Sequence, residues 1–282
     1  MQSDLSQLER VAGAGGLSLE LLGEPARQPS VPRQAPLLFV HGAFAGAWMW
    51  RDNYLPYFAG LGYDSFALSL RGHGGSEGRD GLSTTTLYDY VSDVKTVAAQ
   101  FTVPPVLVGH SMGGLVVDMA LRSHVKSSGA VLLAAVPPTG MGPAVMHALL
   151  ADSALVWQVA LLQTMGPSWV NPQIVQQAVF FDPPGRKRML EYFSLTQPEA
   201  QFALAELALP CWPSATHRRV PIGVVGAEQD AIVLPWMVRA TAAIHGVEPF
   251  WIPGAGHATM LEGHWTKGAE VVTKCLDGLG LK

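Results

Sequence analysis

Short apolar runs alternate along the chain with stretches in which apolar residues recur every three or four positions. The run Leu37–Val40 contains apolar residues alone, as expected for a strand that is buried on both faces of a sheet. Six further strands are expected at residues 17–22, 64–70, 106–108, 130–136, 222–225 and 249–252. Strands that alternate with helical patterns predict an α/β fold, in which a mostly parallel sheet is flanked by helices.

Helical periodicity is clearest after residue 86. From Leu87 to Phe101 the apolar residues fall on one face of a helix. Thr86, with Asp89 three positions later, has the pattern of a capping box at the start of that helix. A second amphipathic stretch runs from residue 265 to 279 near the C-terminus, where a helix would close the sheet.

One region interrupts this alternation. From residue 137 to 217 no strand-like run occurs, and prolines separate stretches of helical character. We interpret this region as a helical cap, or lid, inserted into a core made of residues 1–136 and 218–282. A second independent domain is the alternative, but a helical region that interrupts an α/β core favours a cap. The expected cap helices lie around residues 145–165, 171–181, 185–195 and 199–207.

The composition indicates a folded protein without a nucleic-acid surface. Hydrophobic residues make up 49% of the 282 residues and charged residues 14%, which suffices for a core and argues against disorder. The net charge is −4, and the longest basic run is Arg186-Lys187-Arg188. Because nucleic-acid binding needs a basic patch or stripe, we expect no nucleic-acid partner.

Neither a metal nor a cofactor is expected. The chain contains no H-E-x-x-H, no paired C-x-x-C and no Walker-type Gly-Lys-Ser/Thr. Cys211 and Cys275 lie far apart and are expected to be free or buried thiols. No signal peptide is evident, and the apolar runs are too short to span a bilayer. We therefore expect a cytoplasmic protein without stable membrane insertion, and the sequence leaves its oligomeric state open.

The segment Gly109-His110-Ser111-Met112-Gly113 fits the G-x-S-x-G pattern of a nucleophilic serine. The predicted strand at residues 106–108 leads directly into it, and a helical stretch follows. A serine on a sharp strand-to-helix turn needs small neighbours, because the backbones must approach closely there. The start of the helix also stabilises negative charge that develops beside the serine. Ser111 is therefore the expected nucleophile.

The loop directly after the predicted strand Leu37–Val40 is a candidate oxyanion hole. Acyl transfer needs two backbone N–H groups that point at the developing oxyanion. Met112, the residue after the nucleophile, is expected to supply one, and Ala43 the other. The alternative is an ordinary glycine-containing turn between a strand and a helix. His41 is expected to shape this loop by hydrogen bonding.

Five segments of the chain resemble the α/β-hydrolase superfamily, in the order that is typical of it: LLFVHGAFAGAWMW, LSLRGHGGS, VLVGHSMGG, VVGAEQD and IPGAGH. The resemblance covers about residues 35–280, and the cap is similar only in general character. It implies an α/β-hydrolase fold and the order serine, acid, histidine along the chain. Dehalogenases and epoxide hydrolases of this fold resemble one another in carrying Asp at the nucleophile position, so Ser111 argues against those activities.

Asp230 is the expected acid. It follows the predicted strand at residues 222–225, and ligand chemistry in open α/β sheets collects at the carboxyl ends of strands. The family resemblance places the acid at this position. Glu228 is the nearest rival, whereas Asp93 and Asp118 lie on predicted helices and are expected to be solvated.

His257 is the expected base among nine histidines. It follows the predicted strand at residues 249–252 through a flexible loop, which can present the imidazole to Ser111 while its other nitrogen faces Asp230. His264 is the runner-up, at the start of the last helix. His73 is expected to serve structure.

These residues predict a serine hydrolase that forms an acyl-enzyme and cleaves carboxylic esters of small to medium apolar substrates. Aromatic and methionine residues of the cap are suited to an apolar pocket, although most are expected to form the cap's own core. Whether Trp48 and Trp50 line the site or are buried is left open. Candidate substrate contacts are Phe44, Trp48, Trp157, Trp169 and Phe181.

Other activities are compatible with the same three side chains. C–C bond hydrolysis, perhydrolysis or haloperoxidation without a cofactor, thioester hydrolysis and acyl transfer all use such a set in related sequences. A receptor that binds a ligand on this fold with little turnover is a further alternative. A lipase-like activity on triglyceride emulsions is less expected, because no lipid-anchoring segment is evident.

Overall fold

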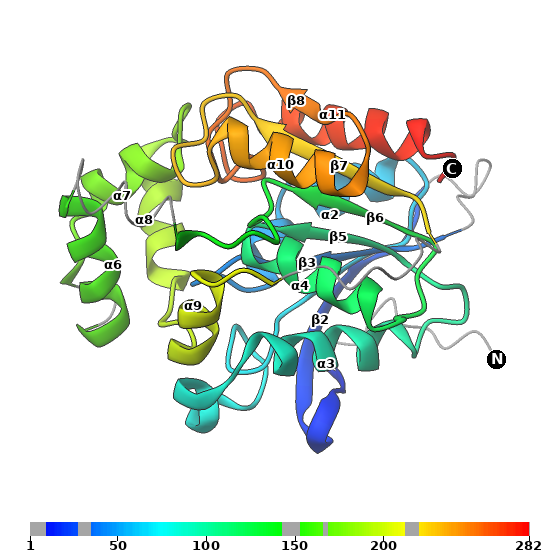
Figure 1. Ribbon diagram of the computed structural model, residues 1–282, viewed down its shortest axis with the longest axis horizontal. Coiled ribbons are helices and arrows are strands. Elements are labelled where there is room, and N and C mark those ends of the chain that lie inside the picture. The colour runs from blue at the N-terminus through cyan, green and yellow to red at the C-terminus, as the bar shows by residue number, and fades with distance from the viewer. Residues whose placement is uncertain (1–9, 28–34, 143–152, 166–168, 212–219, 282) are drawn as a thin grey trace.

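The computed structural model of the protein describes residues 10–27, 35–142, 153–165, 169–211 and 220–281. Its centre is an eight-stranded sheet in the order β1-β2-β4-β3-β5-β6-β7-β8 (Figure 1). The pairs β1–β2 and β2–β4 are antiparallel, and every other pair is parallel. The predicted mostly parallel sheet is therefore confirmed. The strands are β1 (Arg10–Ala12), β2 (Ser18–Glu24), β3 (Leu37–Val40), β4 (Ser65–Leu68), β5 (Val106–His110), β6 (Gly129–Leu133), β7 (Ile222–Ala227) and β8 (Phe250–Ile252).

The central strand β3 lies between β4 and β5, and all of its residues are buried. Successive side chains of a strand point to opposite faces of the sheet. Accordingly, Leu38 and Val40 belong to one hydrophobic cluster, whereas Leu37 and Phe39 belong to another. The sheet therefore has a hydrophobic core on each face, which explains why its strands are continuous apolar runs.

The helices divide between these two faces. Apolar side chains of α3, α4 and α10 pack in the cluster that contains Leu38 and Val40, and those of α1, α2 and α11 pack in the cluster that contains Leu37 and Phe39. The result is a three-layer structure with the sheet in the middle (Figure 1). These helices are α1 (Trp48–Arg51), α2 (Tyr54–Gly60), α3 (Leu87–Ala98), α4 (Met112–Arg122), α10 (Pro235–His245) and α11 (Trp265–Gly278).

Among the described residues, four further helices lie in the chain between β6 and β7, within the region interpreted as a cap. They occupy one side of the molecule, beyond the sheet (Figure 1). The chain enters and leaves this insertion at one place, because the Met141 N–H donates to the Leu207 carbonyl at 2.7 Å and the Cys211 N–H to the Pro138 carbonyl at 2.7 Å. Part of the helix expected at 145–165 lies outside the described residues. The four helices are α6 (Ser153–Met165), α7 (Pro172–Val179), α8 (Arg186–Leu195) and α9 (Gln201–Leu207).

The start of α3 has the predicted capping box. The Asp89 N–H donates to the Thr86 hydroxyl, and the Thr86 N–H donates to the Asp89 carboxylate at 2.9 Å. The predicted solvation of Asp93 and Asp118 is wrong. Both carboxylates are buried, because Arg71 pairs with Asp93 at 2.7 Å and Arg122 pairs with Asp118. A cationic partner makes the burial of each charge tolerable.

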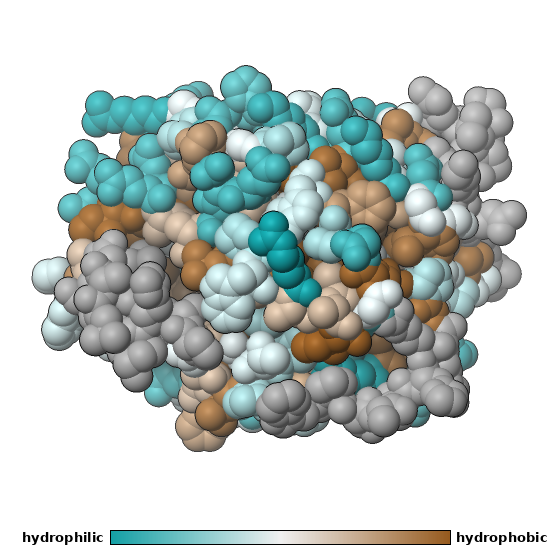
Figure 2. Space-filling model, turned by 45° about the horizontal axis from the view of Figure 1, so that its top comes forward, coloured by the Kyte–Doolittle hydropathy of each residue, from teal (hydrophilic) through white to brown (hydrophobic). Residues whose placement is uncertain are grey.

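None of the helices in the described ranges has the length and apolar content needed to cross a membrane. On the face shown in Figure 2, hydrophilic residues crowd the upper edge, and apolar residues reach the surface in separate patches. The two cysteines are free thiols, of which Cys275 is buried and Cys211 partly exposed. Burial raises the pKa of Cys275 to about 12, so this thiol stays protonated at neutral pH.

Candidate active site

Ser111 lies at the junction of β5 and α4, with backbone angles φ 53° and ψ −121°. Such a conformation is unfavourable for a residue with a side chain and persists only where the surroundings fix it. Here β6 and the residues after it do so. The Ser111 N–H donates to the Leu133 carbonyl at 3.1 Å, and the Ser111 carbonyl accepts from the Val136 N–H at 3.0 Å.

Three glycines allow the backbone to turn this sharply. A Cβ atom on Gly109 would overlap the Gly113 carbonyl, and one on Gly113 would overlap the His41 carbonyl. One on Gly114 would overlap the Ala135 side chain. The backbones of β5, α4 and the loop after β3 therefore approach so closely that larger residues would not fit, as the sequence predicts.

The structure brings Ser111, His257 and Asp230 together in one hydrogen-bonded chain. His257 Nε2 lies 2.9 Å from Ser111 Oγ, and His257 Nδ1 lies 2.8 Å from Asp230 Oδ2. All three side chains are buried. Because a carboxylate can only accept, Nδ1 carries the proton and Nε2 is free to accept from the serine hydroxyl.

Asp230 is itself fixed by the backbone at the carboxyl end of β7. Its second oxygen, Oδ1, accepts from the N–H groups of Ile232 and Val233 at 2.8 and 2.9 Å. The rival Glu228, two residues earlier, is exposed. The two carboxylates thus differ in surroundings, and Asp230 alone of the pair faces the histidine.

The other candidate bases are engaged elsewhere. His264 is largely exposed at the start of α11 and pairs with Asp182. His73 is buried beside Glu199, with 3.1 Å between His73 Nε2 and the carboxylate.

His110 contacts the base from the strand that carries the nucleophile, a contact that sequence reasoning missed. Its Nε2 lies 2.9 Å from the His257 carbonyl and donates to it, and the two imidazole rings are 4.7 Å apart. Burial, together with the nearby His257, lowers the pKa of His110 well below its usual value, so this ring is neutral. The only signal for this contact was its place directly before Ser111.

A buried carboxylate that binds the loop before His257 was also missed. Glu262 Oε1 accepts from the Gly256 N–H at 2.7 Å and from the Phe181 N–H at 2.9 Å. Burial raises the pKa of Glu262 despite these hydrogen bonds. The loop that presents His257 is thereby joined to the segment after α7.

The loop after β3 lies directly against Ser111. A Cβ on Gly42 would be 3.0 Å from Ser111 Cβ. The His41 ring shapes this loop, since its Nδ1 donates to the Gly42 carbonyl at 2.8 Å and its Nε2 accepts from the Leu70 N–H at 3.0 Å. Burial and the neighbouring His73 lower the pKa of His41 to about 3, so it remains neutral.

The candidate oxyanion donors lie on either side of the nucleophile. Met112 is the first residue of α4, so its N–H has no acceptor within the helix. Ala43 follows Gly42 and is partly buried. Phe44 comes next, with a positive φ of 64° that residues other than glycine seldom adopt.

The five candidate substrate contacts are spread over different surroundings. Trp48 is partly buried and stacks on Tyr192 of α8 with 5.9 Å between ring centroids, so it lies where the core meets the insertion. The side chains of Trp157, Trp169 and Phe181 are 68%, 62% and 57% exposed. Trp50, in contrast, is fully buried in the core, 4.9 Å from the Phe39 ring.

Within the described ranges, no group of three or more His, Cys, Asp or Glu side chains is arranged to bind a metal ion. The candidate site consists of a hydroxyl, an imidazole, a carboxylate and backbone N–H groups. Such a set can remove a proton from the serine and stabilise negative charge on an attacked carbonyl oxygen.

A family model described as the alpha/beta hydrolase family matches residues 37–271. The matched range begins with β3 and ends within α11, so it contains Ser111, Asp230 and His257. It also contains the whole insertion between β6 and β7.

Solved structures of similar fold cover nearly the whole chain. The enol-lactonase from Burkholderia xenovorans LB400 has a TM-score of 0.71 at 16% identity, over 95% of this chain and 99% of that one. The esterase EaEST from Exiguobacterium antarcticum has a TM-score of 0.73 at 15% identity, over 95% and 98%. A thermophilic esterase from Thermogutta terrifontis has 0.68 at 18%, over 96% and 98%. The predicted α/β-hydrolase fold is therefore confirmed.

A curated relative matches over a short stretch. Protein ABHD8 of Mus musculus is 32% identical over 78 residues, which is 27% of this chain. The match spans 18% of the length of that relative.

Proposed function

The chain belongs to the alpha/beta hydrolase family, and on that premise we propose that it is a serine hydrolase that cleaves carboxylic esters. The observation that carries this proposal is the chain of hydrogen bonds from Asp230 through His257 to Ser111, with N···O distances of 2.8 and 2.9 Å. A serine hydroxyl becomes a useful nucleophile only beside a base that a third group orients.

The proposed reaction has two halves. Ser111 Oγ attacks the ester carbonyl while His257 Nε2 takes its proton, and the alcohol leaves with that proton. Water then attacks the acyl-enzyme with the help of the same imidazole. Asp230 keeps the proton on Nδ1 and stabilises the imidazolium. The N–H groups of Ala43 and Met112 bind the oxyanion of each tetrahedral intermediate.

The proposed substrates are small to medium apolar esters. Trp48 and Tyr192 support this, because their stacked rings place aromatic surface where the core meets the insertion. The similar structures from Exiguobacterium antarcticum and Thermogutta terrifontis are esterases, and that from Burkholderia xenovorans is an enol-lactonase. A lactone is a cyclic ester, so all three of these similar proteins are named for ester chemistry.

The direct test compares wild-type protein with Ser111→Ala on a series of p-nitrophenyl esters of increasing acyl length. Loss of a nucleophile of this kind lowers kcat by about 10⁴-fold or more, so Ser111→Ala should lose nearly all turnover. Ser92→Ala is the matched control, because the Ser92 hydroxyl donates to the Tyr88 carbonyl on the exposed side of α3, away from the candidate site. Equal rates in wild-type protein and Ser111→Ala would refute the proposal. A profile that favours charged or sugar esters would refute the apolar preference.

A further inference from the structure

The segment that joins α8 to α9 contacts the loop after β3 at Phe44. The Phe44 N–H donates to Glu199 Oε2 at 3.2 Å, and the Phe44 carbonyl accepts from the Gln197 N–H at 3.2 Å. The insertion therefore binds both backbone groups of Phe44. Phe44 and Glu199 are 155 residues apart in the chain.

These two hydrogen bonds act on a strained residue. Phe44 has φ 64°, in the left-handed region that side chains other than glycine seldom adopt. Such a conformation costs free energy and persists only when the surrounding structure over-determines it. At Phe44 the backbone hydrogen bonds that help to fix this conformation come from Gln197 and Glu199 of the insertion.

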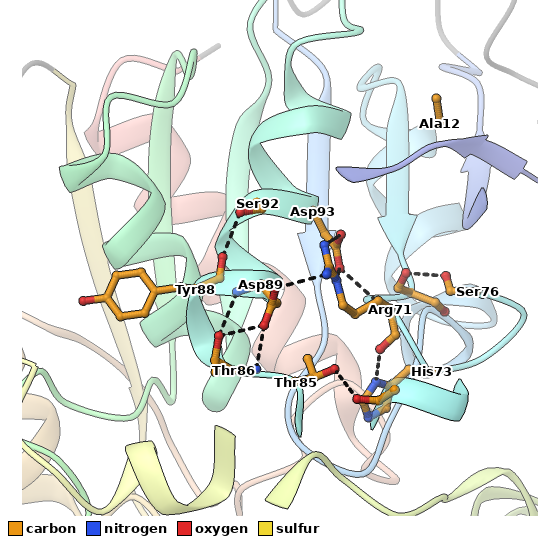
Figure 3. A network of polar contacts seen from close by, with 12 residues as sticks. Ala12, Arg71, His73, Ser76, Thr85, Thr86, Tyr88, Asp89, Ser92 and Asp93 are labelled. Carbon is orange, nitrogen blue, oxygen red and sulfur yellow. Dashed lines mark hydrogen bonds and ion pairs between the residues drawn. The ribbon is translucent and has the colours of Figure 1, made fainter. Parts of the chain in front are cut away.

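The Glu199 carboxylate is set up as a fixed acceptor. Its side chain is fully buried, and Oε2 also lies 3.1 Å from His73 Nε2. Its other oxygen accepts from the Ala200 N–H at 2.7 Å and from the Tyr90 hydroxyl. His73 Nδ1 lies 3.0 Å from the Arg71 carbonyl (Figure 3), so each ring nitrogen of His73 faces an oxygen. A charged Glu199 is thus surrounded by donors.

Side chains on both sides of Glu199 fix the backbone of the segment. The Gln197 amide accepts from the Gly74 N–H at 3.0 Å and donates to the Gly72 carbonyl at 2.7 Å. Gln163 of α6 accepts from the Glu199 N–H at 2.9 Å and donates to the Glu199 carbonyl. The Glu199 carboxylate is therefore held in position independently of its hydrogen bond to Phe44.

We infer that Glu199 and Gln197 are positioning residues of the oxyanion hole, which the insertion holds in its active conformation through Phe44. Ala43 and Phe44 share a peptide unit, so the bonds to Phe44 fix the neighbouring backbone from which the Ala43 N–H projects. This inference rests on the proposed function. It assigns the insertion a part in transition-state stabilisation, in addition to any contact with substrate.

The test replaces the acceptor without changing its shape. In Glu199→Gln an amide NH₂ faces groups that are themselves donors, so the bond to Phe44 weakens and the loop relaxes. Removal of one oxyanion donor typically costs 10²–10³-fold in kcat, so we expect kcat to fall by about 10²-fold. Because the donor acts on the oxyanion and not on bound ester, KM should change little.

Glu206→Gln is the matched control. Glu206 also joins the insertion to the core, since its carboxylate accepts from the Leu87 N–H at 2.7 Å, and in the described part of the chain this carboxylate forms no hydrogen bond with the loop after β3. A second readout is the Ki of a trifluoromethyl ketone with the same acyl chain as the ester, which forms a tetrahedral adduct on Ser111. Its Ki should rise in Glu199→Gln by about the same factor as kcat falls, and stay near the wild-type value in Glu206→Gln.

Two results would overturn the inference: unchanged kcat in folded Glu199→Gln, whether or not KM rises, or an equal loss of kcat in Glu199→Gln and Glu206→Gln. Should Glu199→Gln fail to fold, Glu199→Asp keeps the charge and withdraws the carboxylate by one methylene. A wild-type kcat in Glu199→Asp with the carboxylate withdrawn would then count against positioning, and a partial loss with unchanged KM would support it. Failure of the proposed function is distinct, because wild-type protein and Ser111→Ala would then already be equal.

Discussion

At the scale of single residues, Gly113 shows why the sequence pattern around the serine is so restrictive. Its Cα faces the His41 carbonyl, where a side chain would overlap backbone atoms. The overlap would lie between α4 and the end of β3, and β3 is held in the sheet by its pairing with β5 from Leu37–Val106 to Val40–Gly109. The glycine is required here by close approach and not by its freedom of rotation, since its φ is not positive.

Gly113→Ala should therefore destabilise the fold. Forcing a methyl group into a packed interior costs about 1–3 kcal/mol, and here the obstacle is backbone that cannot change rotamer. We expect the free energy of unfolding, measured by urea denaturation, to fall by at least this amount.

Gly60→Ala provides the comparison. Gly60 ends α2, and an added Cβ there would meet no atom within 4 Å. A glycine-to-alanine change at a compatible position stabilises a protein by about 0.4–1 kcal/mol. Similar losses in the two variants would show that the destabilisation at Gly113 is not steric.

Site residues could be predicted where nearby sequence identifies them, and not where their role depends on a hydrogen-bond partner far away in the chain. Ser111, Asp230 and His257 were proposed because each follows a recognisable strand, and strand ends of a parallel sheet converge. Glu199 and His110 carry no such local signal. Their partners, Phe44 and the His257 carbonyl, lie 155 and 147 residues away, and only the folded chain reveals them.

At the scale of elements, Arg71 attaches the loop after β4 to α3. Its guanidinium reaches Asp93 at 2.7 and 3.0 Å and Asp89 at 3.1 Å (Figure 3). Burial raises the pKa of Asp93 in spite of Arg71, so the carboxylate depends on this cation to remain charged. The ion pairs of Arg71 with Asp93 and Asp89 also fix the Arg71 carbonyl, which accepts from His73 Nδ1.

Arg71→Met should be strongly destabilising, because it leaves the Asp93 charge buried without its partner. Breaking a buried pair in this way costs about 3–5 kcal/mol, and the partial exposure of Arg71 places this pair at the lower end. The double variant Arg71→Met/Asp93→Asn should recover most of that loss, since no unpaired charge remains.

Urea denaturation of both single variants and the double variant completes the cycle. If the double variant were as unstable as the sum of the two single variants, Arg71 and Asp93 would be acting independently.

The strands buried on both faces and α3 were predicted, whereas α1, α2, α10 and β1 were missed. The strands that are buried on both faces gave continuous apolar runs, and α3 gave a capping box and an apolar stripe. The helices α1 and α2 are short, so neither shows a clear apolar period in the sequence. Pro56 lies in the first turn of α2 and further obscures its helical pattern. β1 has only three residues, of which only Val11 is buried, so its pattern is too short to recognise.

At the scale of the whole molecule, two buried carboxylates join the insertion to the loops that carry the candidate site. Glu199 of the insertion binds the loop after β3, and Glu262 of the core binds Phe181 of the insertion and the loop before His257. The length and composition of the region predicted an inserted unit. These attachments depend on three-dimensional placement and could not be predicted from either.

The protonation of Glu199 should link stability to pH. Burial acts to raise its pKa, but the charge of His73 and hydrogen bonds from His73, Tyr90 and Ala200 outweigh burial and lower the pKa below the ordinary 4.5. The ionised form is thus favoured in the folded state. Its contribution to stability is present above pH 4.5 and is lost as the pH falls through the lower folded-state value.

The free energies of unfolding of wild-type protein and Glu199→Gln should therefore converge as the pH falls below 4.5. The largest slope for one proton is about 1.4 kcal/mol per pH unit. Denaturation at pH 7 and at several values below 4.5 measures this, because the other carboxylates are common to both proteins and cancel. A constant difference across that range would mean that Glu199 binds its proton equally in both states.

The insertion leaves and rejoins the core at one place, where Pro138 and Cys211 are hydrogen-bonded neighbours. This junction is a natural place to exchange the insertion for one from another protein in order to change substrate selectivity. In this scaffold the exchange would also remove the acceptor for the Phe44 N–H and the donor for its carbonyl. A transplanted lid must therefore bring its own counterparts of both groups, and selectivity and rate cannot be engineered as independent traits.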